Sequence, residues 1–205
     1  GVITGILRIA KGSIFSGLNN LGVYTLLSNR FSDKFGLTQI EVDQLLKDSS
    51  NEDQAKDIEK WYDGYIFGQN TVYNPWSIIN YIANIEDGFK PYWANTASNE
   101  ILRELFKESP DSIKEEFSDL LKDEPLTKKL DDNIVLRDLK KDQTLIYSFL
   151  LFSGYLKAFD AKKNEEDELY HKLLIPNTEV RLIFKDIISK WINESFESRD
   201  LQIML

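Results

Sequence analysis

The stretch at residues 61–79, WYDGYIFGQNTVYNPWSII, constrains the fold of this chain more than any other. Gly64 follows an apolar-periodic run and predicts a helix end, because glycine adopts a left-handed conformation easily. Two β-prone pieces then flank a tight turn at Gly68, which predicts a small hairpin. Asn74 is a typical N-cap and Pro75 a typical first helical residue. The stretch therefore predicts a helix, a hairpin and a second helix, with aromatic residues crowded where they meet.

The aromatic residues of this stretch are expected to lie in the core, because each of them buries a large apolar area. We expect this for Tyr62, Phe67 and Trp76. Asp63 and Asn74 are polar residues inside an aromatic cluster. Buried polar groups are normally hydrogen-bonded, so these two are expected to be caps, hydrogen-bonded residues or functional groups.

Composition excludes several kinds of site. The 205 residues include no cysteine, which excludes disulfides and thiolate metal sites. They include one histidine, so a multi-histidine metal site or a Ser-His-Asp triad is hard to build. The formal charge of −9 argues against nucleic acid as the main partner, since phosphate binding needs a basic face. A hydrophobic content of 42% is enough to build a core, which argues against disorder of the whole chain.

Membrane and secretion signals are missing from the sequence. The longest apolar run, residues 145–156, is interrupted by Ser and Gly and is too short for a transmembrane helix. The first residues lack the charged region and apolar block of a signal peptide. The absence of cysteine fits a reducing compartment. We therefore expect a cytoplasmic protein without a membrane partner.

Helical patterns precede the opening stretch. Thr38 and Glu41 have the spacing of a capping box, which predicts a helix from Gln39. Residues 51–64 carry an apolar face at helical spacing and predict a second helix that ends at Gly64. With the helix opened by Asn74-Pro75, these segments predict a small bundle of three helices and a hairpin.

The second half of the chain predicts helices and one further hairpin. Residues 123–132 are charged, contain a proline and are expected to be a link. An apolar helix at residues 143–152 precedes an alternating strand at 155–159 and a returning strand at 168–175. Asn177 is expected to cap a long final helix. Helix, hairpin and helix in this order are the outline of a winged helix.

Several motifs resemble one known family. The chain is similar to the AAA-ATPase-like family of bacterial P-loop proteins, whose members commonly carry a PD-(D/E)XK nuclease-like domain at the C-terminus. The motifs that carry the resemblance are Trp61-Tyr62-Asp63-Gly64-Tyr65, Phe67-Gly68, Tyr73-Asn74-Pro75-Trp76-Ser77, Tyr92-Trp93, Asn95-Thr96, Ser153-Gly154-Tyr155-Leu156 and Pro176-Asn177-x-Glu179-Val180.

The resemblance implies a nucleotide-related role for four residues. By this match Thr4 is the candidate sensor of the γ-phosphate of ATP and Arg8 a second candidate. Asn74 and Trp76 would occupy the position of the lid that closes over the nucleotide. ATP and Mg²⁺ are therefore implied as cofactors of the intact protein.

The chain departs from the family at the phosphate-binding loop. It contains no G-x-x-x-x-G-K-[ST] motif, and none of its glycines is followed by Lys-Ser or Lys-Thr. Without that loop, nucleotide affinity should be poor. We therefore expect no cofactor, catalytic residue or metal ligand in this chain, and no activity when it stands alone. The intact protein is expected to be an ATPase.

The resemblance and the patterns together predict a mainly α fold, a helical lid-like bundle followed by a winged-helix-like module with one β-hairpin. We expect residues 1–34 to be a remnant of the ATPase core, formed by the end of the sensor strand and a loop. Residues 35–107 would be the helical lid with its small hairpin. Residues 108–205 would be the winged-helix-like module.

Three functions remain open at this point. The first is the lid and winged-helix-like part of an ATPase, whose partners would be the missing ATPase core and a C-terminal nuclease-like domain. The second is a module that binds a protein partner through an aromatic surface. The third is a nucleic-acid-binding winged helix, which is disfavoured because residues 143–152 carry no Lys or Arg. The lone His171 is expected to be a packed or surface histidine.

Overall fold

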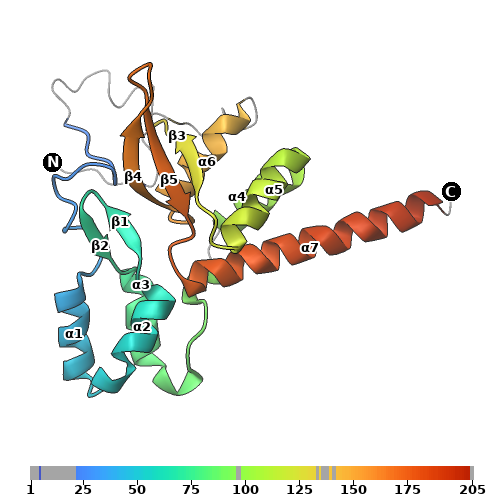
Figure 1. The fold of residues 1–205 in the computed structure, drawn as a ribbon. Coiled ribbons are helices and arrows are strands. Elements are labelled where there is room, and N and C mark those ends of the chain that lie inside the picture. The colour runs from blue at the N-terminus through green and yellow to red at the C-terminus, as the bar shows by residue number, and fades with distance from the viewer. Residues whose placement is uncertain are drawn as a thin grey trace, which may run out of the picture.

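The computed structural model describes Gly5 and residues 22–95, 98–132, 134, 139 and 142–203. Helices in this part of the chain surround two separate hydrophobic cores, and two small antiparallel sheets accompany them (Figure 1). Thr4 and Arg8 lie outside the described residues.

The small core belongs to the first three helices, α1 (Gln39–Asp48), α2 (Ala55–Tyr62) and α3 (Pro75–Ala83). Short 3-10 turns at Glu52–Gln54, Ile85–Asp87 and Tyr92–Asn95 complete this bundle. The start of α1 has the predicted capping box. The buried side chains that define the small core are Val42, Leu46, Ile58, Tyr62, Tyr73, Ile78 and Tyr81.

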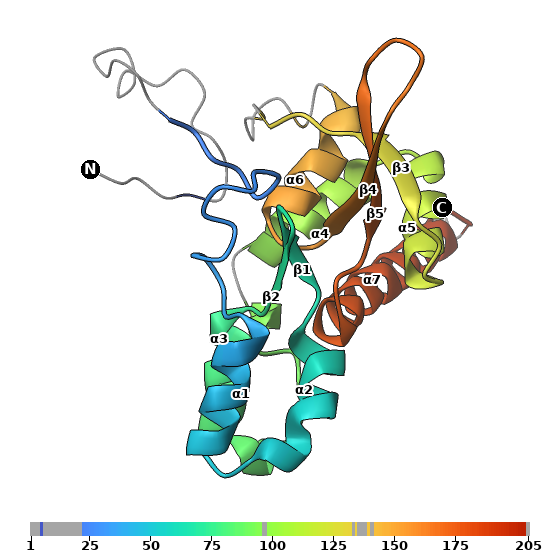
Figure 2. The same cartoon turned by 60° about the vertical axis from the view of Figure 1, so that its left-hand side comes forward.

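The predicted hairpin connects the two cores. Its strands are β1 (Tyr65–Phe67) and β2 (Asn70–Val72), and Gly68 with a φ of +54° occupies the turn. Tyr65 pairs with Val72, and both side chains are buried in the second core rather than in the small one. The hairpin therefore leaves the helical bundle and reaches toward α6, as Figure 2 shows.

The large core is formed by the hairpin and by the second half of the chain. Its helices are α4 (Ser98–Glu108), α5 (Asp111–Leu121), α6 (Ile146–Phe152) and the first half of α7 (Thr178–Ile203), and a 3-10 turn at Gln143–Leu145 precedes α6. The strands β3 (Leu126–Lys129), β4 (Lys157–Lys163) and β5 (Leu169–Leu174) form a sheet in the order β3-β5-β4. Phe117, Leu150, Tyr155 and Phe184 are among its fully buried residues.

The fold class predicted from the sequence is wrong. The described residues form a mixture of helices and two sheets, and not the predicted mainly α fold of a helical lid-like bundle followed by a winged-helix-like module with one β-hairpin. The predicted link at residues 123–132 contains β3, which pairs with β5 along its whole length. The sequence pattern alone did not indicate this strand, because two of its four residues are lysines. Lys128 is half-buried and forms an ion pair with Glu116 at 2.6 Å, which allows a charged residue on the inner face.

Other sequence predictions are confirmed. Asn177 accepts a hydrogen bond from the backbone N–H of Val180 at 3.0 Å, which caps the start of α7. The helix expected to enter a DNA groove in a winged helix is α6, and residues 146–151 of this helix are all buried. The division of the chain at residues 34 and 107 stays a prediction. Within the described residues, no helix combines the length and the apolar character that crossing a membrane requires.

The two cores meet where α2 ends and α7 begins (Figure 2). The Thr178 hydroxyl donates a hydrogen bond to the backbone oxygen of Lys60 at 3.0 Å. Gly64 has a φ of +104°, and an added Cβ would lie 2.3 Å from the backbone oxygen of Pro176. Glycine is therefore required here both for its left-handed backbone and for the close approach of another backbone segment.

Candidate functional site

A pocket of about 280 Å³ lies where the hairpin, the start of α3 and the end of α6 come together. We call it the junction pocket. Its described lining residues are Leu26, Phe35, Gly36, Tyr65, Ile66, Phe67, Val72, Tyr73, Asn74, Pro75, Trp93, Leu151, Phe152, Ser153, Gly154 and Leu156. The pocket therefore draws on segments from both cores and includes much of the sequence stretch that constrained the fold.

The hairpin contributes Tyr65, whose side chain is only 7% exposed. Burial raises the pKa of the Tyr65 hydroxyl, so this group is neutral. The side chains of Asn74 and Asn177 lie near enough to lower that pKa slightly, yet no described residue forms a hydrogen bond of normal geometry with the Tyr65 Oη. A buried hydroxyl without a partner is uncommon in a folded protein.

The end of α6 contributes Ser153 and Gly154. Ser153 is 9% exposed, and its Oγ also has no hydrogen-bond partner in the described part of the chain. Gly154 has a φ of +82°, and an added Cβ would lie 3.5 Å from both Trp93 Cη2 and Tyr65 Cε1. The helix thus ends in a left-handed residue that brings a bare backbone up to two aromatic rings.

The start of α3 contributes Asn74, which the sequence singled out. Its side-chain oxygen accepts a hydrogen bond from the backbone N–H of Trp76 at 3.0 Å, so Asn74 is the predicted N-cap. Trp76 was expected in the core, but it is 59% exposed. Its indole N–H donates to the backbone oxygen of Tyr92 at 3.3 Å. Asn74 therefore lines the pocket, whereas most of the Trp76 ring faces solvent.

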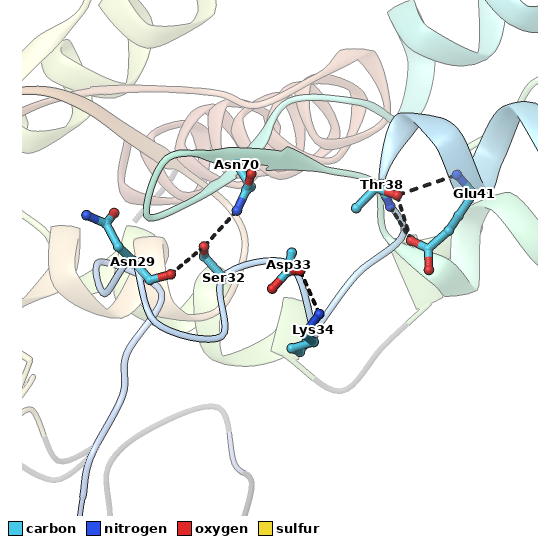
Figure 3. A network of polar contacts seen from close by, with 7 residues as sticks. All are labelled: Asn29, Ser32, Asp33, Lys34, Thr38, Glu41 and Asn70. Atoms are coloured by element: carbon cyan, nitrogen blue, oxygen red, sulfur yellow. Dashed lines mark hydrogen bonds and ion pairs between the residues drawn. The ribbon is translucent and has the colours of Figure 1, made fainter.

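The loop before α1 supplies another wall of the pocket, and hydrogen bonds hold it at both ends (Figure 3). At one end the Asn70 side-chain amide donates to the Ser32 hydroxyl at 2.8 Å, and that hydroxyl donates to the backbone oxygen of Asn29 at 2.8 Å. At the other end the backbone N–H of Thr38 donates to the Glu41 carboxylate at 2.8 Å. These bonds fix the loop against β2 and against α1.

Between these anchors the loop carries Phe35 and Gly36 to the pocket. Leu37 and Tyr73 form a two-way backbone bridge with N–O distances of 3.0 and 2.8 Å. Gly36 has a φ of +122°, and an added Cβ would lie 2.8 Å from Val72 Cγ2. Phe35 is 54% exposed, so the pocket reaches the surface on this side.

A buried carboxylate holds Trp93 and α3 in place beside the pocket. Glu179, in the first turn of α7, is 0% exposed. It accepts a hydrogen bond from the Ser77 hydroxyl at 2.7 Å and one from the backbone N–H of Trp93 at 2.9 Å. Burial raises the pKa of Glu179, while the hydrogen bonds from Trp93 and Ser77 act in the opposite direction.

The described lining of the junction pocket is uncharged and does not pair its serine with a base. Ser153 is the only serine that lines it among the described residues, and a nucleophilic serine needs a base within hydrogen-bond reach. No Asp, Glu, Lys, Arg or His is among the described lining residues. A search of the described chain finds no group of three or more His, Cys, Asp or Glu side chains placed to hold a metal ion.

Sequence reasoning found part of this site. It selected Asn74 as a polar residue among aromatics, and that residue lines the pocket. It missed Tyr65, Ser153 and Glu179 as polar groups buried at the junction. The signal for Glu179 was a carboxylate beside a helix cap in an apolar segment, which is equally typical of an exposed first-turn residue. Thr4 and Arg8 lie outside the described residues, so their positions relative to the pocket are not described.

Comparison with known proteins gives one distant relative. The chain is 26% identical over 180 residues to a protein of Azotobacter chroococcum mcd 1 named "Uncharacterized protein in vnfD 5'region". The matched region is 88% of this chain and 32% of that protein, so the chain spans about a third of its relative's length. No family model matches the chain, and no solved structure matches it significantly.

Proposed function

We propose that this chain is a non-catalytic part of a AAA-like P-loop ATPase, the part that closes over Mg-ATP as a lid. In the intact protein it would connect an ATPase core to a nuclease-like effector domain. The observation that carries the proposal is the start of α3, where Asn74 caps a helix within a small separate bundle and also lines a pocket. The motif series from Thr4 to Val180 in the sequence supports it, together with the missing phosphate-binding loop.

The way the two cores are joined fits a lid. The buried residues of the small core form a cluster separate from the large core. Its contacts with the rest of the molecule include the hairpin, the close approach of Gly64 to Pro176 and the Glu179 hydrogen bonds. A body with its own core can move as a unit when such a narrow connection flexes. Closure of the lid would then change the environment of the junction pocket.

A titration with Mg-ATP tests this proposal. Tryptophan fluorescence would follow binding to this chain and to a version extended upstream in its own reading frame. We expect binding only by the extended version, because this chain lacks the phosphate-binding loop. In the extended version, Thr4→Val and Arg8→Ala should slow ATP hydrolysis. If the extended version does not bind Mg-ATP, the lid role is wrong.

A second candidate function rests on one surface. Trp76 and Ile79 lie three residues apart on α3, and they are 59% and 57% exposed. Residues at this spacing share a helix face, so the two side chains form a small apolar area on the outside of the bundle. Trp61 and Trp93 are half-buried and Tyr65 is buried, which makes the aromatic surface narrower than the sequence predicted. With a charge of −9, a basic protein would be the matching partner.

The two candidate functions predict different results for Trp76→Ala. A binding partner recovered from the source cell should be lost with this variant if α3 is an interaction face, because exposed tryptophans dominate such contacts. If α3 is instead part of the lid, where the resemblance places Trp76, the same variant should weaken nucleotide binding by the extended version.

A further inference from the structure

Helix α3 is apolar on almost every side, yet one of its faces is exposed. Its residues, Pro75–Ala83, include no charged side chain. Ser77, Ile78 and Tyr81 are buried, and the last two belong to the small core. A helix that is apolar all round is normally covered on all sides. The described part of the chain therefore leaves one face of α3 uncovered.

The uncovered face consists of Trp76, Ile79 and Ala83, which we call the α3 stripe. Trp76 is 59% exposed and Ile79 is 57% exposed, and Ala83 is exposed as well. Residues at this spacing lie on the same side of a helix. The polar Asn80 and Asn84 lie beside them in the helix and at its end. Exposed apolar side chains that are grouped and rimmed by polar residues are typical of interaction sites.

The tryptophan of the α3 stripe is held in place in the free chain. Its indole N–H donates a hydrogen bond to the backbone oxygen of Tyr92 at 3.3 Å, and its backbone oxygen accepts one from the Asn80 side-chain amide at 2.8 Å. A side chain that is already fixed loses less conformational entropy when a partner binds. Trp76 is therefore suited to be the anchor of a contact, and tryptophan is among the most frequent anchors at interfaces.

The charge around α3 indicates which partner fits. The small bundle, residues 37–95, contains ten Asp or Glu residues and four Lys residues, so it carries −6 of the total charge of −9. Nine of these ten acidic residues are exposed. The ion pair between Asp87 and Lys90 is the only one formed within this range of the described chain. Such a charge repels nucleic acid, an anionic lipid surface and a second copy of the bundle, and it attracts a basic protein segment.

Acidic groups also lie at one end of the α3 stripe. The helix ends at Ala83, and the turn Ile85–Asp87 follows it with Glu86 and Asp87 exposed. Glu86 has no ion-pair partner among the described residues. The unpaired carbonyl groups at a helix C-terminus add a partial negative charge. A matching partner therefore has apolar side chains along the stripe and a Lys or Arg near its Ala83 end.

We propose that the α3 stripe docks a basic amphipathic helix of a partner protein. The apolar side chains of that helix would lie on Trp76 and Ile79, and its Lys or Arg side chains would lie over the acidic turn. This inference rests on the second candidate function, because it names the partner of the same surface. It involves no nucleotide and is separate from the lid role.

Three synthetic peptides of about 14 residues, long enough for about four helical turns, test the chemistry of the partner. Each has leucines at helical spacing, and its other positions are all lysine, all glutamine or all glutamate. Isothermal titration calorimetry on this chain should give a dissociation constant below about 100 μM for the lysine peptide. The glutamate peptide should bind at least about tenfold more weakly, because its charge is repelled by the bundle.

Two variants test the position of the contact. Ile79→Ala should weaken binding of the lysine peptide at least about fivefold and leave the melting temperature unchanged, because this side chain is largely exposed. Trp76→Ala should weaken binding about tenfold or more. Because Trp76→Ala also removes the hydrogen bond to Tyr92, the conclusion rests on Ile79→Ala if that variant proves less stable.

Ile40→Ala is the matched control. Ile40 is 81% exposed and lies in the same acidic bundle, but on α1. This variant should bind the lysine peptide as the parent chain does. If it weakens binding as much as Ile79→Ala, the peptide follows the acidic charge and not the α3 stripe, and the proposal is wrong.

The remaining outcomes separate this proposal from the function on which it rests. If the glutamine or glutamate peptide binds best and still requires Ile79, α3 is an interaction face but its partner is not basic. If binding of no peptide depends on Ile79, both the proposal and the second candidate function are wrong. The version extended upstream should bind the lysine peptide as this chain does. Loss of binding there would mean that the added chain covers the stripe, and would overturn the assignment to a partner protein.

Discussion

The small core and the junction pocket lie side by side, yet they differ in whether their buried hydroxyl groups are hydrogen-bonded. Three tyrosines are buried in the small core, and each hydroxyl donates a hydrogen bond. Tyr62 donates to the backbone oxygen of Lys90 at 3.0 Å, and Tyr73 to the Gln39 side chain at 2.6 Å. The Tyr81 hydroxyl lies 3.5 Å from the Gln54 side-chain oxygen. The hydroxyls of all three tyrosines are thus paired.

The junction pocket leaves its hydroxyls unpaired. Tyr65 and Ser153 find no partner among the described residues, although each such group costs about 1–3 kcal/mol of folding free energy. Unpaired groups also occur at the half-buried Tyr92, which packs against the small core, at His171 on β5, and at the side-chain amide nitrogen of Asn177, which lies near the Tyr65 hydroxyl. Tyr65 and Ser153 differ from these because both residues line the same pocket. The comparison indicates that hydroxyls are better paired in the small core than at the junction between the two cores.

Gly64→Ala should have the largest effect, because it breaks the connection between the two regions. The new Cβ would lie 2.3 Å from the Pro176 backbone oxygen, and the φ of +104° disfavours any L side chain. Strain and overpacking together should lower the free energy of unfolding by roughly 2–5 kcal/mol. Urea denaturation followed by circular dichroism would measure it.

Gly88→Ala is the control for Gly64→Ala. Gly88 also has a positive φ, +70°, but nothing lies within 4 Å of an added Cβ. Its ψ of −168° places it in a backbone region that is essentially restricted to glycine, so its substitution should lower the free energy of unfolding by about 1–3 kcal/mol through backbone strain alone. Equal effects of the two substitutions would show that the close approach at Pro176 contributes nothing.

Glu179→Ala should have the next largest effect. It leaves the Ser77 hydroxyl and the Trp93 backbone N–H without their acceptor in a buried place. The loss should lower the free energy of unfolding by about 2–3 kcal/mol. Glu179→Gln keeps one acceptor oxygen and should be milder. An Ala variant as stable as the parent would mean that the Glu179 hydrogen bonds, which connect α7 to Ser77 on α3 and to Trp93, do not stabilise the fold.

The pH dependence of stability in the parent and in Glu179→Gln gives a second test of the role of Glu179. Burial raises the pKa of Glu179 above its ordinary value of 4.5, so the folded chain holds this proton more tightly than the unfolded chain. The stability of the parent relative to the Gln variant should therefore fall as pH rises from 4.5 through the raised pKa, and then stay constant. Melting temperatures of both proteins between pH 4 and 7 would show it. A difference that stays constant or rises over this range would contradict the raised pKa.

Asn74→Ala should have a smaller effect on stability. The N-cap bond to the Trp76 N–H is lost, which lowers the free energy of unfolding by about 1 kcal/mol. Asn74→Asp keeps the acceptor and adds a charge that the helix dipole favours, so it should retain the stability of the parent. If Asn74→Ala costs several times more, Asn74 does more at the pocket than cap α3.

The predictable part of the fold is the part with local signals. The capping box of Thr38 and Glu41 gave the first residue of α1, and Asn74 with Pro75 gave the first residue of α3. The strand β3 was not predicted, because its partner β5 lies more than 40 residues away and its own lysines suggested a link. Long-range pairing can override local composition in this way.

The candidate site was harder to predict than the elements that carry it. Trp76 and Tyr65 both belong to the aromatic stretch, yet one is largely exposed and the other is buried. Spacing could not separate them, because the exposure of each depends on which distant segment covers it. Tyr65 is covered by the end of α6, about 90 residues further along the chain, where Ser153 and Gly154 lie. Hydroxyls left unpaired at such a contact are visible only in three dimensions.

The smallest expected effects come from Tyr62→Phe and Tyr65→Phe, and they test the comparison itself. The two substitutions remove the same atom from two tyrosines that are both buried. Tyr62→Phe breaks a hydrogen bond to Lys90 and should lower the free energy of unfolding by about 1 kcal/mol. Tyr65→Phe removes an unpaired hydroxyl and should leave that free energy unchanged or raise it by up to about 1 kcal/mol. Urea titrations of the two variants beside the parent would show the sign of each effect. If Tyr65→Phe destabilises the chain as much as Tyr62→Phe, its hydroxyl has a partner in the free protein, and the contrast between the paired tyrosine hydroxyls of the small core and the unpaired hydroxyls at the junction disappears.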